Sequence, residues 1–84
     1  MKAYSIPENI AISDSGFIFL PTTGETFTLN ETGKTIFKYF QQKRNLDEII
    51  NSLLDEYEID RLTLERDLED FILRLKSLNL LVEL

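Results

Sequence analysis

The sequence of 84 residues contains no cysteine, no histidine and no tryptophan. Without cysteine there are no disulfides and no thiol nucleophiles, and without histidine as well the usual ligands of zinc and haem are missing. An imidazole base is excluded for the same reason. Carboxylates remain available, but no calcium-loop motif gathers them. We therefore expect no catalytic residue, no metal site and no cofactor.

The chain also lacks long hydrophobic runs and an excess of basic residues. No stretch approaches the roughly 20 apolar residues of a transmembrane helix, and no apolar run follows Met1–Ser5, so neither a membrane span nor a secretory signal is expected. A cytoplasmic location is the default. The 15 acidic and nine basic residues give a formal charge of −6, which has the wrong sign for holding a phosphate backbone. We expect no nucleic-acid partner.

What is present suits one small globular unit. A hydrophobic content of 43% in a chain of this length supports a single modest core. No internal repeat and no linker rich in Pro, Gly or Ser divides the chain. The sequence predicts one domain that spans residues 1–84.

Short strands are predicted in the first third of the chain. Ile10–Ile12 and Phe17–Leu20 flank Ser13–Gly16, whose small polar residues and glycine suit a tight turn. Pro21–Glu25 supplies a second turn before Thr26–Leu29. The simplest topology is a three-stranded antiparallel meander.

The third of these strands alternates polar and apolar residues. Alternation places Phe27 and Leu29 on one face and Thr26 and Thr28 on the other. At the edge of a sheet, the outer backbone groups of such a strand are free to pair with another chain. The segment Lys2–Glu8, predicted to be a lead-in or an edge strand, closes that edge if it folds over it.

Two helices should follow the strands. Asn30 is a suitable N-cap for a helix that runs to about Gln41. Asn45 begins the next, with Glu48 placed three residues later to complete a capping box.

A third helix is predicted to be capped by Thr63 and to end near Asn79, because asparagine tolerates the left-handed cap conformation. The apolar tail Leu80–Leu84 either adds a short strand or covers the helices.

This order of elements predicts an α+β fold that is winged helix-turn-helix-like, with a three-stranded antiparallel sheet followed by three helices. The usual DNA-binding use of that fold conflicts with the charges, because ten acidic residues between Asp47 and Asp70 stand against only Arg61 and Arg66. A winged-helix protein–protein adaptor or transcriptional regulator stays as the alternative interpretation. A small carboxylate enzyme is the least supported.

The ordered set of segments resembles the PqqD-like family, named for pyrroloquinoline quinone biosynthesis protein D and also called the RiPP recognition element. No single motif carries this resemblance; the spacing of the whole set does. The matching segments are Leu29–Gly33 with Ile36 and Phe37, Leu46–Ile50, Asp67–Leu75 and Leu78–Leu81.

The resemblance implies a non-catalytic peptide-binding chaperone. Such a protein holds the leader of a ribosomally made precursor peptide as an added strand and presents it to a modifying enzyme, often a radical SAM protein. It implies no cofactor. Because an open strand edge also permits two copies to pair, a monomer or a weak homodimer is expected.

Carried over by position, the resemblance places the leader between the third strand and the third helix. Asp67 and Arg74 are seven residues apart on that helix, so they share a side and bracket the peptide with one acid and one base. The implied peptide-binding residues are Thr26, Phe27, Thr28 and Leu29 on the strand, and Leu64, Asp67, Leu68, Phe71 and Arg74 on the helix.

Overall fold

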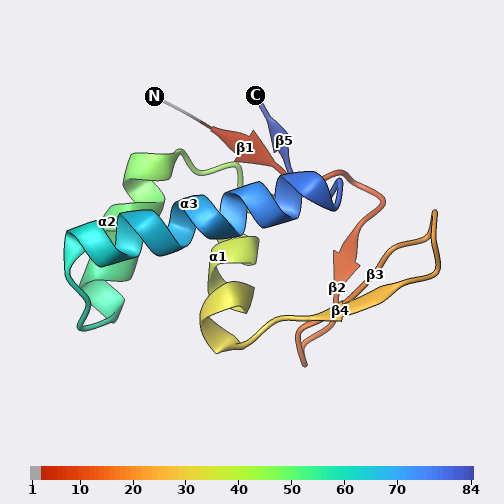
Figure 1. Ribbon diagram of the computed structural model, residues 1–84, viewed down its shortest axis with the longest axis horizontal. Helices are drawn as coiled ribbons and strands as arrows, with labels where there is room; N and C mark the ends of the chain where they lie inside the picture. Colours follow the sequence, from red (N-terminus) through yellow and green to blue (C-terminus); the bar gives the residue numbers. More distant parts are fainter. Residues whose placement is uncertain (1–2) are drawn as a thin grey trace.

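The computed structural model describes residues 3–84. It holds three helices and two small antiparallel sheets (Figure 1). The elements in chain order are β1 (Tyr4–Ser5), β2 (Ala11–Ile12), β3 (Phe17–Phe19), β4 (Thr26–Thr28), α1 (Glu31–Gln41), α2 (Leu46–Glu56), α3 (Arg61–Ser77) and β5 (Val82–Glu83). The predicted α+β fold, a three-stranded antiparallel sheet followed by three helices, is confirmed.

The three-stranded sheet is a meander in the order β2-β3-β4. Each strand is slightly shorter than the sequence predicted, but the pairing is the expected one, with Ile12 opposite Ile18 and Ile18 opposite Phe27. These side chains face the helices, and Ile18 is fully buried. The central strand β3 is therefore paired on both sides, while β4 has a neighbouring strand on one side only in the part of the chain that the structure describes.

The helices begin where polar side chains accept hydrogen bonds from free backbone N–H groups. Asn30 accepts from Gly33 at the start of α1 (2.8 Å). At the start of α2, Asn45 accepts from the Glu48 N–H (2.9 Å), and the Glu48 carboxylate accepts from the Asn45 N–H (3.1 Å). Both predicted starts, including the capping box, are confirmed.

The prediction that Thr63 caps the third helix is wrong. The N-cap is Asp60, whose carboxylate accepts both the backbone N–H of Thr63 (3.1 Å) and its hydroxyl (2.7 Å). These hydrogen bonds lower the pKa of Asp60, the hydroxyl contributing most. Helix α3 thus gains a first turn that the sequence assigned to a loop, and it ends before Asn79, which has the expected left-handed backbone (φ 59°).

The two ends of the described chain pair with each other. Tyr4 lies opposite Glu83 and Ser5 opposite Val82, so β1 and β5 form a separate two-stranded sheet. The tail therefore adds a short strand, one of its two predicted alternatives. Within the segment Lys2–Glu8, Lys2 lies outside the described residues. Residues 3–8 contain β1 and lead into the turn that follows it, and they do not cover β4.

One hydrophobic core joins the sheet to the helices. Its largest fully buried side chains are Phe37, Phe40, Ile18, Ile49, Leu53, Leu68, Leu75 and Leu80. Helix α3 crosses the molecule beside this core, with β4 along one side of its second half (Figure 1). Between residues 3 and 84, no helix has the length and hydrophobicity needed to cross a membrane.

Gly16 fixes the junction between β4 and α1. Its φ is +89°, and an added Cβ would lie 2.6 Å from the carbonyl oxygen of Leu29. Gly24 also has a positive φ (+76°), but a Cβ there meets no atom within 4 Å. Substitution of Gly24 therefore measures the energetic cost of a positive φ alone, whereas substitution of Gly16 adds the cost of the close contact with Leu29.

We expect Gly24→Ala to lower the free energy of unfolding by about 1 kcal/mol through strain alone, and Gly16→Ala by about 2 kcal/mol because steric overlap is added. Urea unfolding followed by circular dichroism measures both. Equal losses in the two variants would show that the contact with Leu29 has no energetic weight.

Candidate functional site

No strand within residues 3–84 pairs with the outer edge of β4. The N–H of Leu29 donates to the carbonyl of Gly16 beside β3 (2.8 Å), and Phe27 lies two residues earlier on the same strand. Groups that face a neighbouring antiparallel strand recur at every second residue, so Phe27 also faces β3. The N–H and C=O groups of Thr26 and Thr28 consequently point to the open edge.

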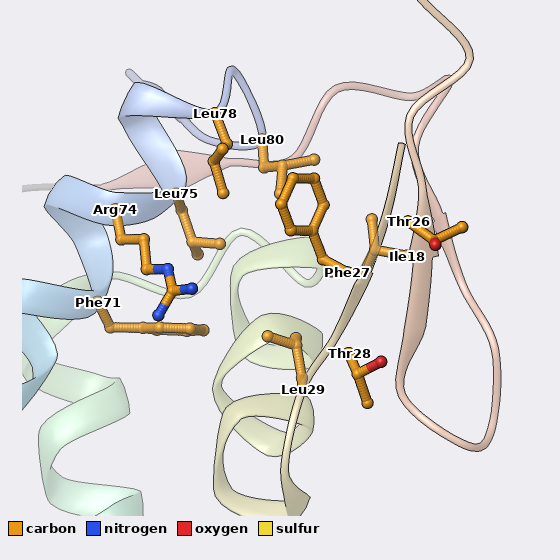
Figure 2. Close-up of a pocket in the computed structure, with 10 residues that line it drawn as sticks. All are labelled: Ile18, Thr26, Phe27, Thr28, Leu29, Phe71, Arg74, Leu75, Leu78 and Leu80. Carbon is orange, nitrogen blue, oxygen red and sulfur yellow. The ribbon is translucent and has the colours of Figure 1, made fainter. Parts of the chain in front are cut away.

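The side chains of β4 divide as the alternation predicted. Phe27 and Leu29 are half-buried and pack against the core, whereas Thr26 and Thr28 are exposed. Figure 2 shows Phe27 and Leu29 directed toward α3 and the two threonines directed away from it. An added strand on this edge would therefore continue the pleat and place alternate side chains toward α3.

A groove runs between β4 and α3, and we call it the β4–α3 groove. It consists of two adjoining hollows that share Thr28, Leu29, Phe71 and Arg74 in their walls. The first has a volume of about 260 Å³ and the second about 310 Å³. Seven of the ten residues in the wall of the first hollow have hydrocarbon side chains, and the wall is formed by Ile18, Thr26, Phe27, Thr28, Leu29, Phe71, Arg74, Leu75, Leu78 and Leu80 (Figure 2).

The structure brings seven of the nine predicted site residues to this groove. All four strand residues, with Phe71 and Arg74 from the helix, line the first hollow. Asp67 lines only the second, where α3 passes the end of β4 and the start of α1. The remaining two, Leu64 and Leu68, are buried in the core, 5% and 2% exposed, and line neither hollow.

The sequence reasoning missed four residues of the first hollow: Ile18, Leu75, Leu78 and Leu80. The available signal was helical spacing, because Leu75 and Leu78 follow Phe71 by four and seven residues and so lie on its side of α3. The same spacing marked them as core, and Leu75 belongs to both, since it is 2% exposed and still borders the hollow. Periodicity alone does not separate core from groove.

The charges of the groove are sparse. Of the described residues, Arg74 alone is charged in the wall of the first hollow, and Asp67 joins it in the second. Both side chains are exposed. The three ion pairs found among residues 3–84 involve other side chains, so Arg74 and Asp67 lack an ion-pair partner within the described chain.

The wall of the β4–α3 groove combines hydrocarbon side chains, threonine hydroxyls, the amide of Asn30, one guanidinium and one carboxylate, with an unpaired strand edge along one side. Within residues 3–84, no group of three or more carboxylates is positioned to hold a metal ion. The arrangement suits an extended peptide, which needs main-chain partners and apolar subsites.

Two solved structures have the same fold. The chain is 31% identical to a protein solved as TbiB1 in complex with the TbiA(beta) leader peptide, with a TM-score of 0.81 and coverage of 92% of this chain and 93% of that one. It is 23% identical to lasso peptide synthetase B1 complexed with the leader peptide, with a TM-score of 0.83 and coverage of 94% and 96%. At that lower identity the second likeness shows a shared fold.

No curated protein matches the chain. The family profile of coenzyme PQQ synthesis protein D (PqqD) matches residues 16–81, which extend from just before β3 to just before β5. The matched region contains β4, α3 and the whole wall of the β4–α3 groove. By this match over most of its length, and by its identity to TbiB1, the chain belongs to the PqqD family.

Proposed function

We propose that this protein binds the leader segment of a ribosomally made precursor peptide and presents it to a modifying enzyme, of which a radical SAM protein is the expected kind. The protein itself acts without catalysis. The leader adds to β4 as a further strand, with every second side chain in the β4–α3 groove. The observation that carries the proposal is the open edge of β4 beside an apolar groove.

Two further observations support this function. A family relative and a second protein of the same fold were both solved with leader peptides bound. The outward backbone groups of Thr26 and Thr28 also supply what β-augmentation needs, because main-chain hydrogen bonds give affinity while the groove selects side chains.

The winged-helix alternative has less support. In a DNA-binding winged helix, the third helix enters the major groove. Here the exposed positions of α3 carry four acidic residues and four basic ones, so the helix lacks the excess of positive charge that binding to phosphates requires. An electrophoretic mobility shift at low salt with random-sequence DNA should show no complex.

The leader is sought among the short reading frames that neighbour the gene, each made as a synthetic peptide and titrated with the folded protein. Short random peptides displayed on yeast serve as an independent source of ligands. We expect at least one neighbouring precursor to bind. A folded protein that binds none of these precursors, and selects no displayed peptide, would contradict the proposal.

Strand addition is tested by Thr28→Pro. Proline removes the outward N–H of residue 28 and places its ring where the added strand would lie, yet no hydrogen bond to β3 is lost. We expect about tenfold weaker binding of the selected peptides, since one main-chain hydrogen bond contributes about 1 kcal/mol and the ring adds steric hindrance.

The control for this substitution is Thr28→Val, which keeps the N–H and the branched shape but removes the hydroxyl. It should bind like the wild type in the same calorimetric titration. If proline and valine weaken binding equally while both variants stay folded, the ligand does not pair with the edge of β4.

A further inference from the structure

The main-chain bonds of an added strand do not fix where along the peptide the strand begins. Any extended sequence offers the same N–H and C=O groups, and a slip by two residues returns the same side-chain face to the groove. Selection of one position in a peptide must therefore come from side chains. Among the described residues, the guanidinium of Arg74 is the only charged group in the wall of the first hollow.

The side chain of Arg74 lies where a peptide bound in the groove would contact it. It lines both hollows, and Figure 2 shows its side chain extending from α3 in the same direction as Phe71, toward β4. Its side chain has no ion-pair partner among residues 3–84. The backbone carbonyl of Arg74 accepts hydrogen bonds from Leu78 and Ser77, which fixes this turn of the helix.

The positive charge of Arg74 stands on a protein that is acidic as a whole. The protein has a net charge of −6, so an acidic peptide side chain meets repulsion over most of the molecule. Beside Arg74 it meets a positive charge, the one charge that residues 3–84 place in the wall of the first hollow. An arginine offers a carboxylate two parallel donors, a geometry that lysine does not have.

We propose that Arg74 sets the register of the bound peptide by pairing with an acidic residue that is flanked by apolar residues facing the groove. This inference rests on the proposed function. The apolar neighbours occupy the first hollow beside Phe71, Leu75 and Leu78. From Asp67 to Leu78 the helix is about 16 Å long, so about five residues of an extended peptide lie along it.

Asp67 adds a preference for a basic peptide residue at the other end of the groove. It lies two helical turns before Arg74, a distance of about 10 Å, which about three residues of an extended strand cover. Because only every second residue of a strand faces the groove, Asp67 favours a basic residue two or four positions from the acidic one, toward the end of the groove formed by Leu29 and Thr32. A peptide slipped by two residues loses the match at Arg74 and Asp67 together.

Random peptides displayed on yeast are selected separately against the wild type, Arg74→Glu and Arg66→Glu. The last is the matched control, because Arg66 lies on α3 with the same charge change but borders neither hollow. We expect the wild type and Arg66→Glu to enrich Asp or Glu at one position beside apolar residues. Arg74→Glu should enrich Lys or Arg at that position.

A synthetic wild-type binder and its copy with lysine at the acidic position then give the affinities. Arg74→Glu should weaken the acidic peptide roughly fivefold and strengthen the lysine copy, as expected for a partly exposed charge pair, while Arg66→Glu changes both equally and little. If the selected peptides have no acidic position, or if Arg74→Glu and Arg66→Glu have equal effects, Arg74 does not set the register. Strand addition to β4 would still hold in that case. An absence of any binder would instead contradict the proposed function.

Discussion

Replacing Phe40 with alanine should lower the free energy of unfolding by about 3–5 kcal/mol. The ring is 0% exposed and lies in the core on α1, where it meets the edge of Tyr4 with centroids 5.7 Å apart and planes at 75°. Its removal costs the transfer free energy of the ring and leaves a cavity bordered by α1 and β1. Natural domains have about 0.05–0.15 kcal/mol of stability per residue, so this one change removes a large share of the total.

Urea unfolding measures this loss, with Phe19→Ala as the matched control. Phe19 is 54% exposed on the outer face of β3, so its truncation should change stability by no more than about 0.5 kcal/mol. Where Phe40→Ala is too unstable to measure, Phe40→Leu should show an intermediate loss of about 1 kcal/mol. Equal losses for the Phe19 and Phe40 alanine variants would contradict the assignment of Phe40 to the core.

Replacing Phe71 with alanine should weaken peptide binding about 100-fold, the largest effect we expect on affinity. Phe71 is half-buried and lines both hollows of the β4–α3 groove. It is the largest apolar side chain that α3 contributes to them, and large aromatic anchors dominate binding energies in such sites. Calorimetric titration with a peptide selected by the wild type measures the effect.

Leu73→Ala is the control on the same helix. Leu73 is 59% exposed and lines neither hollow of the groove, so its loss should leave the affinity unchanged. Circular dichroism establishes that both variants stay helical. Wild-type affinity in a folded Phe71→Ala protein would show that the peptide binds elsewhere.

The sequence predicted those features that depend on neighbouring residues. The capping box of Asn45 and Glu48 and the two faces of β4 each follow from a spacing of two or three positions. The start of α3 was misplaced because Asp60 and Thr63 both rank as good caps. In the structure Asp60 is the N-cap, and its carboxylate accepts hydrogen bonds from Thr63. This arrangement depends on the geometry of that one carboxylate.

The features that the sequence left open depend on distant residues. Whether β4 keeps its edge free depended on where the segment before Glu8 would pair, and its partner is Val82–Glu83 at the opposite end of the chain. The residues of α3 that line the groove were also difficult to predict from the sequence. Leu68 and Leu75 share a helical face with little to separate them, yet Leu75 borders the hollow and Leu68 does not.

The pairing of β1 with β5 has a consequence for the order of folding. It closes a loop of nearly the whole chain, whereas the meander and the helix starts join residues close in sequence. Loop-closure entropy makes long-range contacts late to form. With only two residues in each strand, this pair should also be the first to open, releasing Tyr4 from Phe40 while the edge of β4 keeps its shape. Among the amides that are hydrogen-bonded between strands, the least protected in hydrogen exchange would then lie in β1 and β5, away from the groove.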